Sequence, residues 1–88
     1  MLFMAHWTYR PEHRNAMITR FKETGGAPVP KGVKLLGRWT AASGGQGWNV
    51  VETDDASLII KACMDWSDLM TIDYSPVVTD EDLAKLFK

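Results

Sequence analysis

Two residues in this sequence have side chains that could move or donate a proton in a binding pocket. His6 lies among apolar neighbours, and its imidazole has an unperturbed pKa near neutrality, which suits a general base or a donor that orients a ligand. Tyr74 could supply a phenol to a pocket. The alternative for His6 is a core or interface histidine with both nitrogens hydrogen-bonded, and Tyr74 could equally have a purely structural role.

Arg38 and Trp39 are adjacent in a segment with strand character, so their side chains are expected on opposite faces. The guanidinium of Arg38 could bind a substrate carboxylate through two parallel hydrogen bonds. The role that we favour for Arg38 is an ion pair across the sheet with Asp73 or Glu52. Trp39 is expected in the core or in a dimer interface, with a ligand pocket as the alternative, and Trp48 is expected to be a packing residue more than a recognition residue.

Residue types that bind metals or attack substrates form no recognisable pattern. His6, His13 and Cys63 have no spacing typical of a metal site, so no metal or other cofactor is predicted. Residues 44–47 are glycine-rich, but they lie between two predicted strands and therefore indicate a hairpin turn instead of a phosphate-binding loop. Cys63 falls in the apolar stripe of a predicted helix and is expected to be a buried, inert thiol.

The composition fits one small globular domain over residues 1–88. The hydrophobic fraction is 45%, and 10 basic against 11 acidic residues give a net charge of −1, which favours solvated helix faces over a nucleic-acid surface. No stretch reaches the ~18 apolar residues that a membrane span needs. The single cysteine cannot form a disulfide within the chain, and the N-terminus lacks a basic leader, so no membrane partner is predicted and the cytoplasm is the expected location.

Apolar periodicity and turn residues predict four strands and three helices. The strands cover residues 2–9, 33–42, 48–53 and 70–78. The helices begin at Pro11, at Asp54 or Asp55, and at Thr79, and the first ends at Gly25 and Gly26. The order strand, helix, strand, strand, helix, strand is the ferredoxin-like arrangement of the α+β class, with an antiparallel sheet and both main helices on one face.

The predicted strands carry large apolar side chains on both faces. The second strand, for example, is expected to place Leu35 and Trp39 on one face and Leu36 on the other. Because the helices cover only one face of the sheet, the other face needs a partner. A chain of this length buries only about 60% of its unfolded surface, so the sequence predicts a homodimer that completes the core.

Two segments resemble a known family. They are residues 24–39 (TGGAPVPKGVKLLGRW) and residues 45–55, which begin GQGW and continue through VVETDD; residues 66–69 (WSDL) and the opening MLFM are consistent with them. Over nearly its whole length the chain resembles the small bacterial proteins grouped as domain of unknown function 3303. The family pattern has a histidine after Gly-Arg-Trp where this chain has Thr40, so chemistry that depends on that histidine is not expected here.

The resemblance implies a fold and an assembly but no particular reaction. Such proteins are similar to the dimeric α/β-barrel superfamily, in which two ferredoxin-like subunits press their open sheet faces together. That superfamily includes cofactor-independent monooxygenases, small-molecule isomerases, haem-binding enzymes and proteins without known chemistry. Fold alone does not choose among these activities.

The residues and the resemblance together leave three hypotheses of function. The first is a homodimer that holds a small apolar or aromatic ligand between its sheet and helices, with a lining that includes His6, Arg38, Trp39, Trp48 and Tyr74. The second is a cofactor-independent monooxygenase or isomerase in which His6 or Tyr74 moves a proton. The third is a structural or protein-interaction dimer without catalysis.

Overall fold

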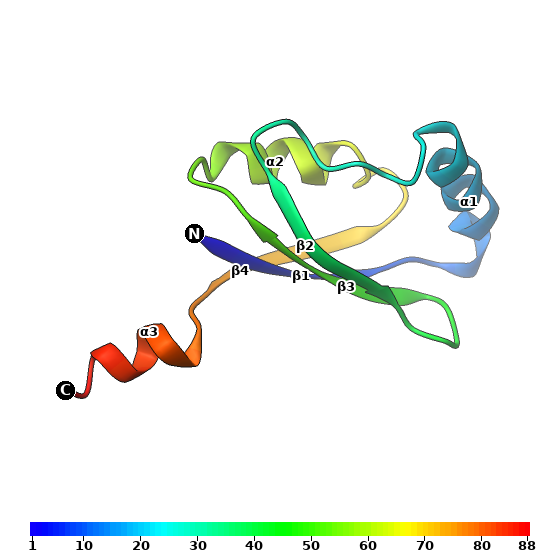
Figure 1. Cartoon of the computed structure of the whole chain (residues 1–88). Helices are drawn as coiled ribbons and strands as arrows, with labels where there is room; N and C mark the ends of the chain where they lie inside the picture. The colour runs from blue at the N-terminus through cyan, green and yellow to red at the C-terminus, as the bar shows by residue number, and fades with distance from the viewer.

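The computed structural model describes residues 1–88 as a four-stranded sheet, two helices above it and a third helix at the C-terminus (Figure 1). The strands are β1 (Leu2–Thr8), β2 (Lys34–Thr40), β3 (Gln46–Glu52) and β4 (Thr71–Val77). The helices are α1 (Arg14–Glu23), which follows a 3-10 helix (Pro11–His13), α2 (Ser57–Met64) and α3 (Asp80–Lys85). This order confirms the predicted ferredoxin-like α+β fold.

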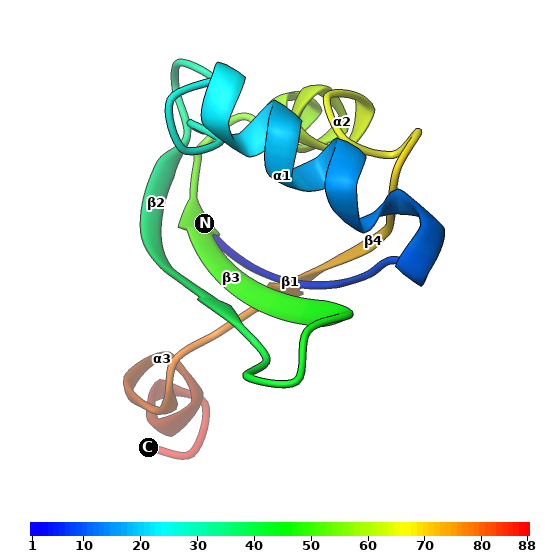
Figure 2. The ribbon, with the colours of Figure 1, turned by 90° about the vertical axis from the view of Figure 1, so that its right-hand side faces the viewer.

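The sheet is antiparallel throughout, with β1 and β3 at its centre. The strand order is β2-β3-β1-β4. On β1, His6 lies opposite Trp48 of β3 and Asp73 of β4, so these three side chains share one face of the sheet. Figure 2 shows a curved sheet with α1 and α2 on one side. The opposite side, called the open face below, has no helix packed flat against it.

Alternation along β1 and β3 builds the core on the helix side. Phe3, Ala5 and Trp7 are buried in β1, while Met4 and His6 between them are exposed on the open face. The central apolar cluster joins Phe3 to Val51 of β3 and Ile59 of α2. Only 8 of 88 residues are buried, so one copy of the chain has a thin core for its size.

A β-bulge in β2 overturns the predicted alternation of that strand. Leu35 pairs with Val51, but the next paired residue is Gly37, opposite Val50, so Leu36 is the extra residue. One inserted residue reverses the faces of everything that follows it. Leu35 therefore lies on the helix side, whereas Trp39 lies on the open face and is 59% exposed, and the prediction that the two share a face was wrong.

The predicted helix ends agree with the local chemistry. Gly25 and Gly26, with φ of 75° and 100°, end the first helical segment in the left-handed region that glycine adopts readily. The carboxylate of Asp55 accepts the backbone N–H of Ser57 at the start of α2. The hydroxyl of Thr79 accepts the N–H of Asp82 at 3.1 Å, which caps α3.

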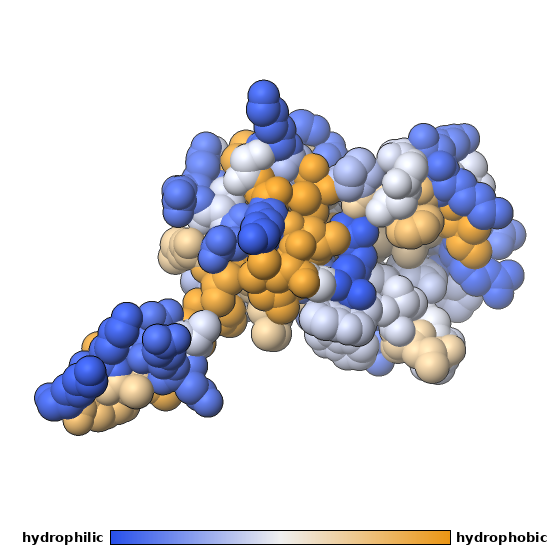
Figure 3. Space-filling view, viewed as in Figure 1, coloured by the Kyte–Doolittle hydropathy of each residue, from blue (hydrophilic) through white to orange (hydrophobic).

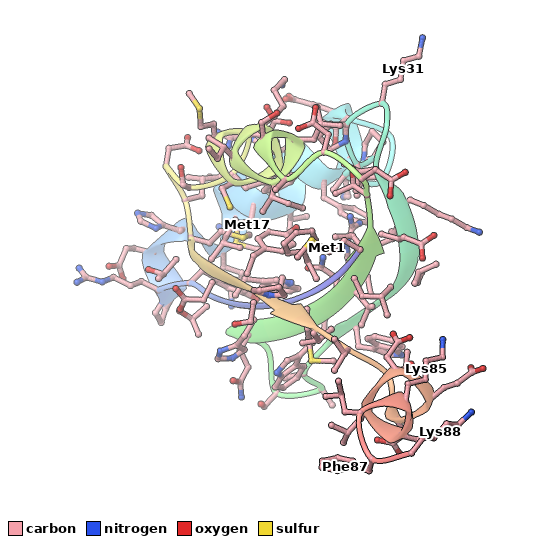
Figure 4. All side chains as sticks on the ribbon, turned by 90° about the vertical axis from the view of Figure 1, so that its left-hand side faces the viewer. Met1, Met17, Lys31, Lys85, Phe87 and Lys88 are labelled. Atoms are coloured by element: carbon pink, nitrogen blue, oxygen red, sulfur yellow. The ribbon has the colours of Figure 1, made fainter.

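Helix α3 projects from the body of the molecule. Figures 1 and 2 show it beyond the end of β4 and on the same side as the open face, and the long axis of the chain accordingly reaches 50 Å. Phe87, at the outer end of this segment in Figure 4, is 80% exposed. Figure 3 shows an apolar patch on the body beside the point where the chain leaves for α3. None of the helices has the length and apolar character that crossing a membrane requires.

Candidate ligand cavity

A cavity of about 330 Å³ lies between the sheet and the helices. Twelve of its 19 lining residues are hydrophobic. Trp7 and Ile72 line it from the sheet, Met17 and Phe21 from α1, and Trp66 from the turn after α2. Figure 4 shows Met17 in the layer between the helices and the sheet. These walls are suited to an apolar or aromatic ligand.

Arg38 brings a cation to this apolar cavity. Its Nη1 donates to the carbonyl oxygen of Gly26 at 3.2 Å and its Nη2 to that of Ala27 at 2.8 Å. No carboxylate lies within ion-pair distance of its guanidinium. Burial lowers the pKa of Arg38 from its usual value, because desolvation disfavours the charged form. The guanidinium of Arg38 therefore lines the cavity without an ion-pair partner. The carboxylate of Asp65 also lines the cavity and pairs with Lys61 at 2.7 Å.

The two carbonyl contacts of Arg38 hold a strained part of the cavity wall. Ala27 has φ of 53°, in the left-handed region that residues with a side chain rarely adopt. Its N–H donates to the hydroxyl of Thr24 at 3.1 Å, which restrains the same turn from the other side. Such backbone geometry persists where surrounding contacts hold it in place, and Arg38 and Thr24 supply those contacts here.

Tyr74 and Asn49 add neutral polar groups to the cavity. Asn49, 5% exposed in the middle of β3, donates through Nδ2 to the phenol oxygen of Tyr74 at 3.3 Å. Burial is the main cause that raises the pKa of Tyr74, and the hydrogen bond from Asn49 opposes this in part. The phenol therefore stays protonated at neutral pH and keeps its O–H as a donor.

The five predicted lining residues divide between the two faces of the sheet. Arg38 and Tyr74 both line the cavity. His6, Trp39 and Trp48 lie on the open face and cannot reach it. The bulge in β2 turns Trp39 to the open face, and the alternation of β1 and β3 places His6 and Trp48 there. The cavity is thus built from fewer of the predicted residues than expected.

The predicted ion pair of Arg38 with Asp73 or Glu52 was wrong. Residues 72 and 74 of β4 line the cavity, so Asp73 between them faces the opposite side. Glu52 follows buried Val51 in β3 and faces the same open side as Asp73. Arg38 points to the helix side, so the sheet itself separates it from both carboxylates.

On the open face, His6 has contacts of its own. Its ring stacks on Trp48 with centroids 5.4 Å apart and an angle of 21° between the planes. Its Nε2 lies 3.0 Å from Oε1 of Gln46. Trp39 lies opposite Trp48 on the neighbouring strand. The result is an exposed row of aromatic rings across three strands, outside the cavity.

The structure adds lining residues that sequence reasoning missed. Asn49 could have been found, because a polar amide at a buried position of an alternating strand needs a partner. Trp66 also lines the cavity, and Arg20 lies over its ring at 5.5 Å. Arg20 also forms a bidentate pair with Asp68, at 2.6 and 2.7 Å, which ties α1 to the turn after α2.

Neither a metal centre nor a reactive thiol is visible among the side chains. No group of three or more His, Cys, Asp or Glu residues is placed to hold a metal ion. Burial, with a smaller contribution from the charge of Asp73, raises the pKa of the Cys63 thiol, so the thiol stays protonated near neutral pH. The polar side chains that the cavity offers a ligand therefore include Arg38, Tyr74 and Asn49, and Lys22, Asp65 and Tyr9 line it as well.

Comparison with known proteins assigns a family to this fold and cavity. No curated protein matches the chain. A family model described as "Domain of unknown function (DUF3303)" matches residues 1–88, which is the whole chain. The chain therefore belongs to the DUF3303 family.

Proposed function

We propose that this protein binds a small apolar or aromatic ligand in the cavity between sheet and helices, and that it does so as a homodimer. The observation that carries the binding proposal is the cavity of about 330 Å³ with its mainly hydrophobic lining and a few inward polar groups. Binding sites for small molecules have this makeup, with volumes of roughly 300–1,000 Å³. A volume at the lower end of that range favours a ligand of one or two rings.

The homodimer proposal is supported by the open face. Trp39, Leu36 and Met4 are each between 46% and 59% exposed there, and Trp48 is 38% exposed. Contiguous apolar surface of this kind mostly marks an interaction site. The occupant that we propose is a second copy of this chain, because the thin core of one copy gains most from a like apolar face.

An enzymatic role is the weaker proposal. The monooxygenase or isomerase hypothesis uses His6 or Tyr74 to move a proton. Of these two, only Tyr74 lines the cavity, and its raised pKa suits a hydrogen-bond donor more than a base. Binding without proton transfer therefore remains the function that we propose.

Filling the cavity tests the binding proposal. Ala62, on α2, lines the cavity, and Ala62→Leu places three more carbon atoms in it. We expect calorimetric titration with the neutral probe 2-naphthalenemethanol to give affinity for the wild type and about tenfold weaker affinity for this variant. Ala16→Leu, at an exposed position of α1 outside the cavity, is the matched control and keeps the wild-type affinity. Equal affinity in all three proteins would place the probe elsewhere.

A further inference from the structure

We propose that the ligand of this cavity carries a carboxylate, which Arg38 and Tyr74 bind while the ligand's apolar body lies against the hydrophobic walls. This inference rests on the binding function proposed above and specifies the class of ligand. Its evidence is the arrangement of hydrogen-bond donors around the cavity.

Arg38 has N–H donors that no protein group accepts. A guanidinium has five N–H groups, and the protein accepts one from Nη1 and one from Nη2. The other three have no acceptor on the protein. Nε has no partner at all, yet no buried side-chain nitrogen of the chain lacks a partner, so Nε is accessible. Because its two partners are neutral carbonyls, the charge is still uncompensated, and a ligand anion would compensate it.

Tyr74 supplies a second hydrogen-bond donor, its phenol O–H. Its oxygen accepts from Asn49, so its own proton needs a different acceptor. No side chain or backbone group of the protein takes that proton. Tyr74 and Arg38 line the same cavity, and the proposal places a ligand acceptor where it receives bonds from both.

The wall chemistry favours a carboxylate over a phosphate. Phosphate sites commonly use several backbone N–H groups or a helix N-terminus. Here the lining loop includes Pro28 and Pro30, which have no N–H to give. A single guanidinium beside a phenol matches the single charge and planar oxygens of a carboxylate. Lys22 also lines the cavity and has no ion-pair partner, so it is a second cation against which the role of Arg38 can be tested.

Two matched probes test the charge assignment. Calorimetric titration compares 2-naphthoate with 2-naphthalenemethanol, which has the same ring system and no charge. We expect the wild type to bind the acid about tenfold to hundredfold tighter, the range that hydrogen bonds to a charged group provide. Arg38→Gln should remove this preference. Because Arg38 also holds the turn at Gly26 and Ala27, the quantity compared is the ratio of the two affinities within each protein. Lys22→Gln, the control at a second cation of the cavity, should keep the preference.

Tyr74→Phe is a second variant that leaves the turn held by Arg38 intact. It should lower the preference for the acid several-fold. Equal affinity of the wild type for both probes would overturn the carboxylate assignment and leave the proposed binding function standing. If neither probe binds the wild type, the binding function itself is wrong and the carboxylate assignment falls with it. A preference that survives Arg38→Gln but not Lys22→Gln would also overturn the assignment.

Discussion

At the scale of single residues, the cavity depends on where bulky rings meet small neighbours. Trp7 lines the cavity and is only 8% exposed, and its indole lies directly over Gly47 on the paired strand. A Cβ at position 47 would collide with three atoms of this ring. Glycine is therefore required here for close approach, since its φ is not in the left-handed region. The ring occupies the space that any larger side chain at position 47 would need.

Gly47→Ala tests this packing directly. We expect the variant to lose about 1–3 kcal/mol of unfolding free energy in urea denaturation, because the buried ring of Trp7 cannot move aside without disturbing the cavity. Gly37→Ala is the matched control. Its Cβ would also meet a tryptophan ring, that of Trp39, but that ring is exposed and can swing into solvent. A loss as large for Gly37→Ala as for Gly47→Ala would contradict this account.

At the scale of elements, β2 shows which structural features the sequence pattern predicts and which it does not. Period-two alternation describes β1 and β3 well, because their buried residues alternate without interruption. The bulge at Leu36 has no such signature, and it exchanges the faces of Arg38 and Trp39 relative to Leu35. The fold was predictable because predicting it requires only the order of the strands and helices. The site was not predictable in full, because predicting it requires knowing which face of the sheet each side chain occupies.

Helix α3 shows the same division between local and tertiary signals. Its start was predicted at Thr79, because a capping hydroxyl acts within one turn of the chain. Nothing in the local pattern indicated that the helix stands away from the body (Figure 1). Leu86 and Phe87 stay 75% and 80% exposed as a result. In the proposed dimer, these side chains and the open face are the apolar surfaces available to a second copy.

At the scale of the whole molecule, the proposed dimer predicts a mass. Light scattering at micromolar concentration should give twice the 9.9 kDa chain mass. Trp39→Asp should shift the protein toward the monomer, because the open face would then have to bury a charge. Ile60→Asp is the matched control, since Ile60 is 63% exposed on α2, away from the open face, and should leave the mass unchanged. A wild-type protein of single-chain mass would rule out the dimer at that concentration.

The four tryptophans provide the most direct test of the proposed binding site. Trp7 and Trp66 line the cavity, whereas Trp39 and Trp48 lie on the open face, so the indole N–H signals form two groups within one protein. In a titration of ¹⁵N-labelled protein with 2-naphthoate, we predict that the signals of Trp7 and Trp66 shift and those of Trp39 and Trp48 stay in place. Shifts confined to Trp39 and Trp48, or no shift at any indole, would contradict binding in the cavity.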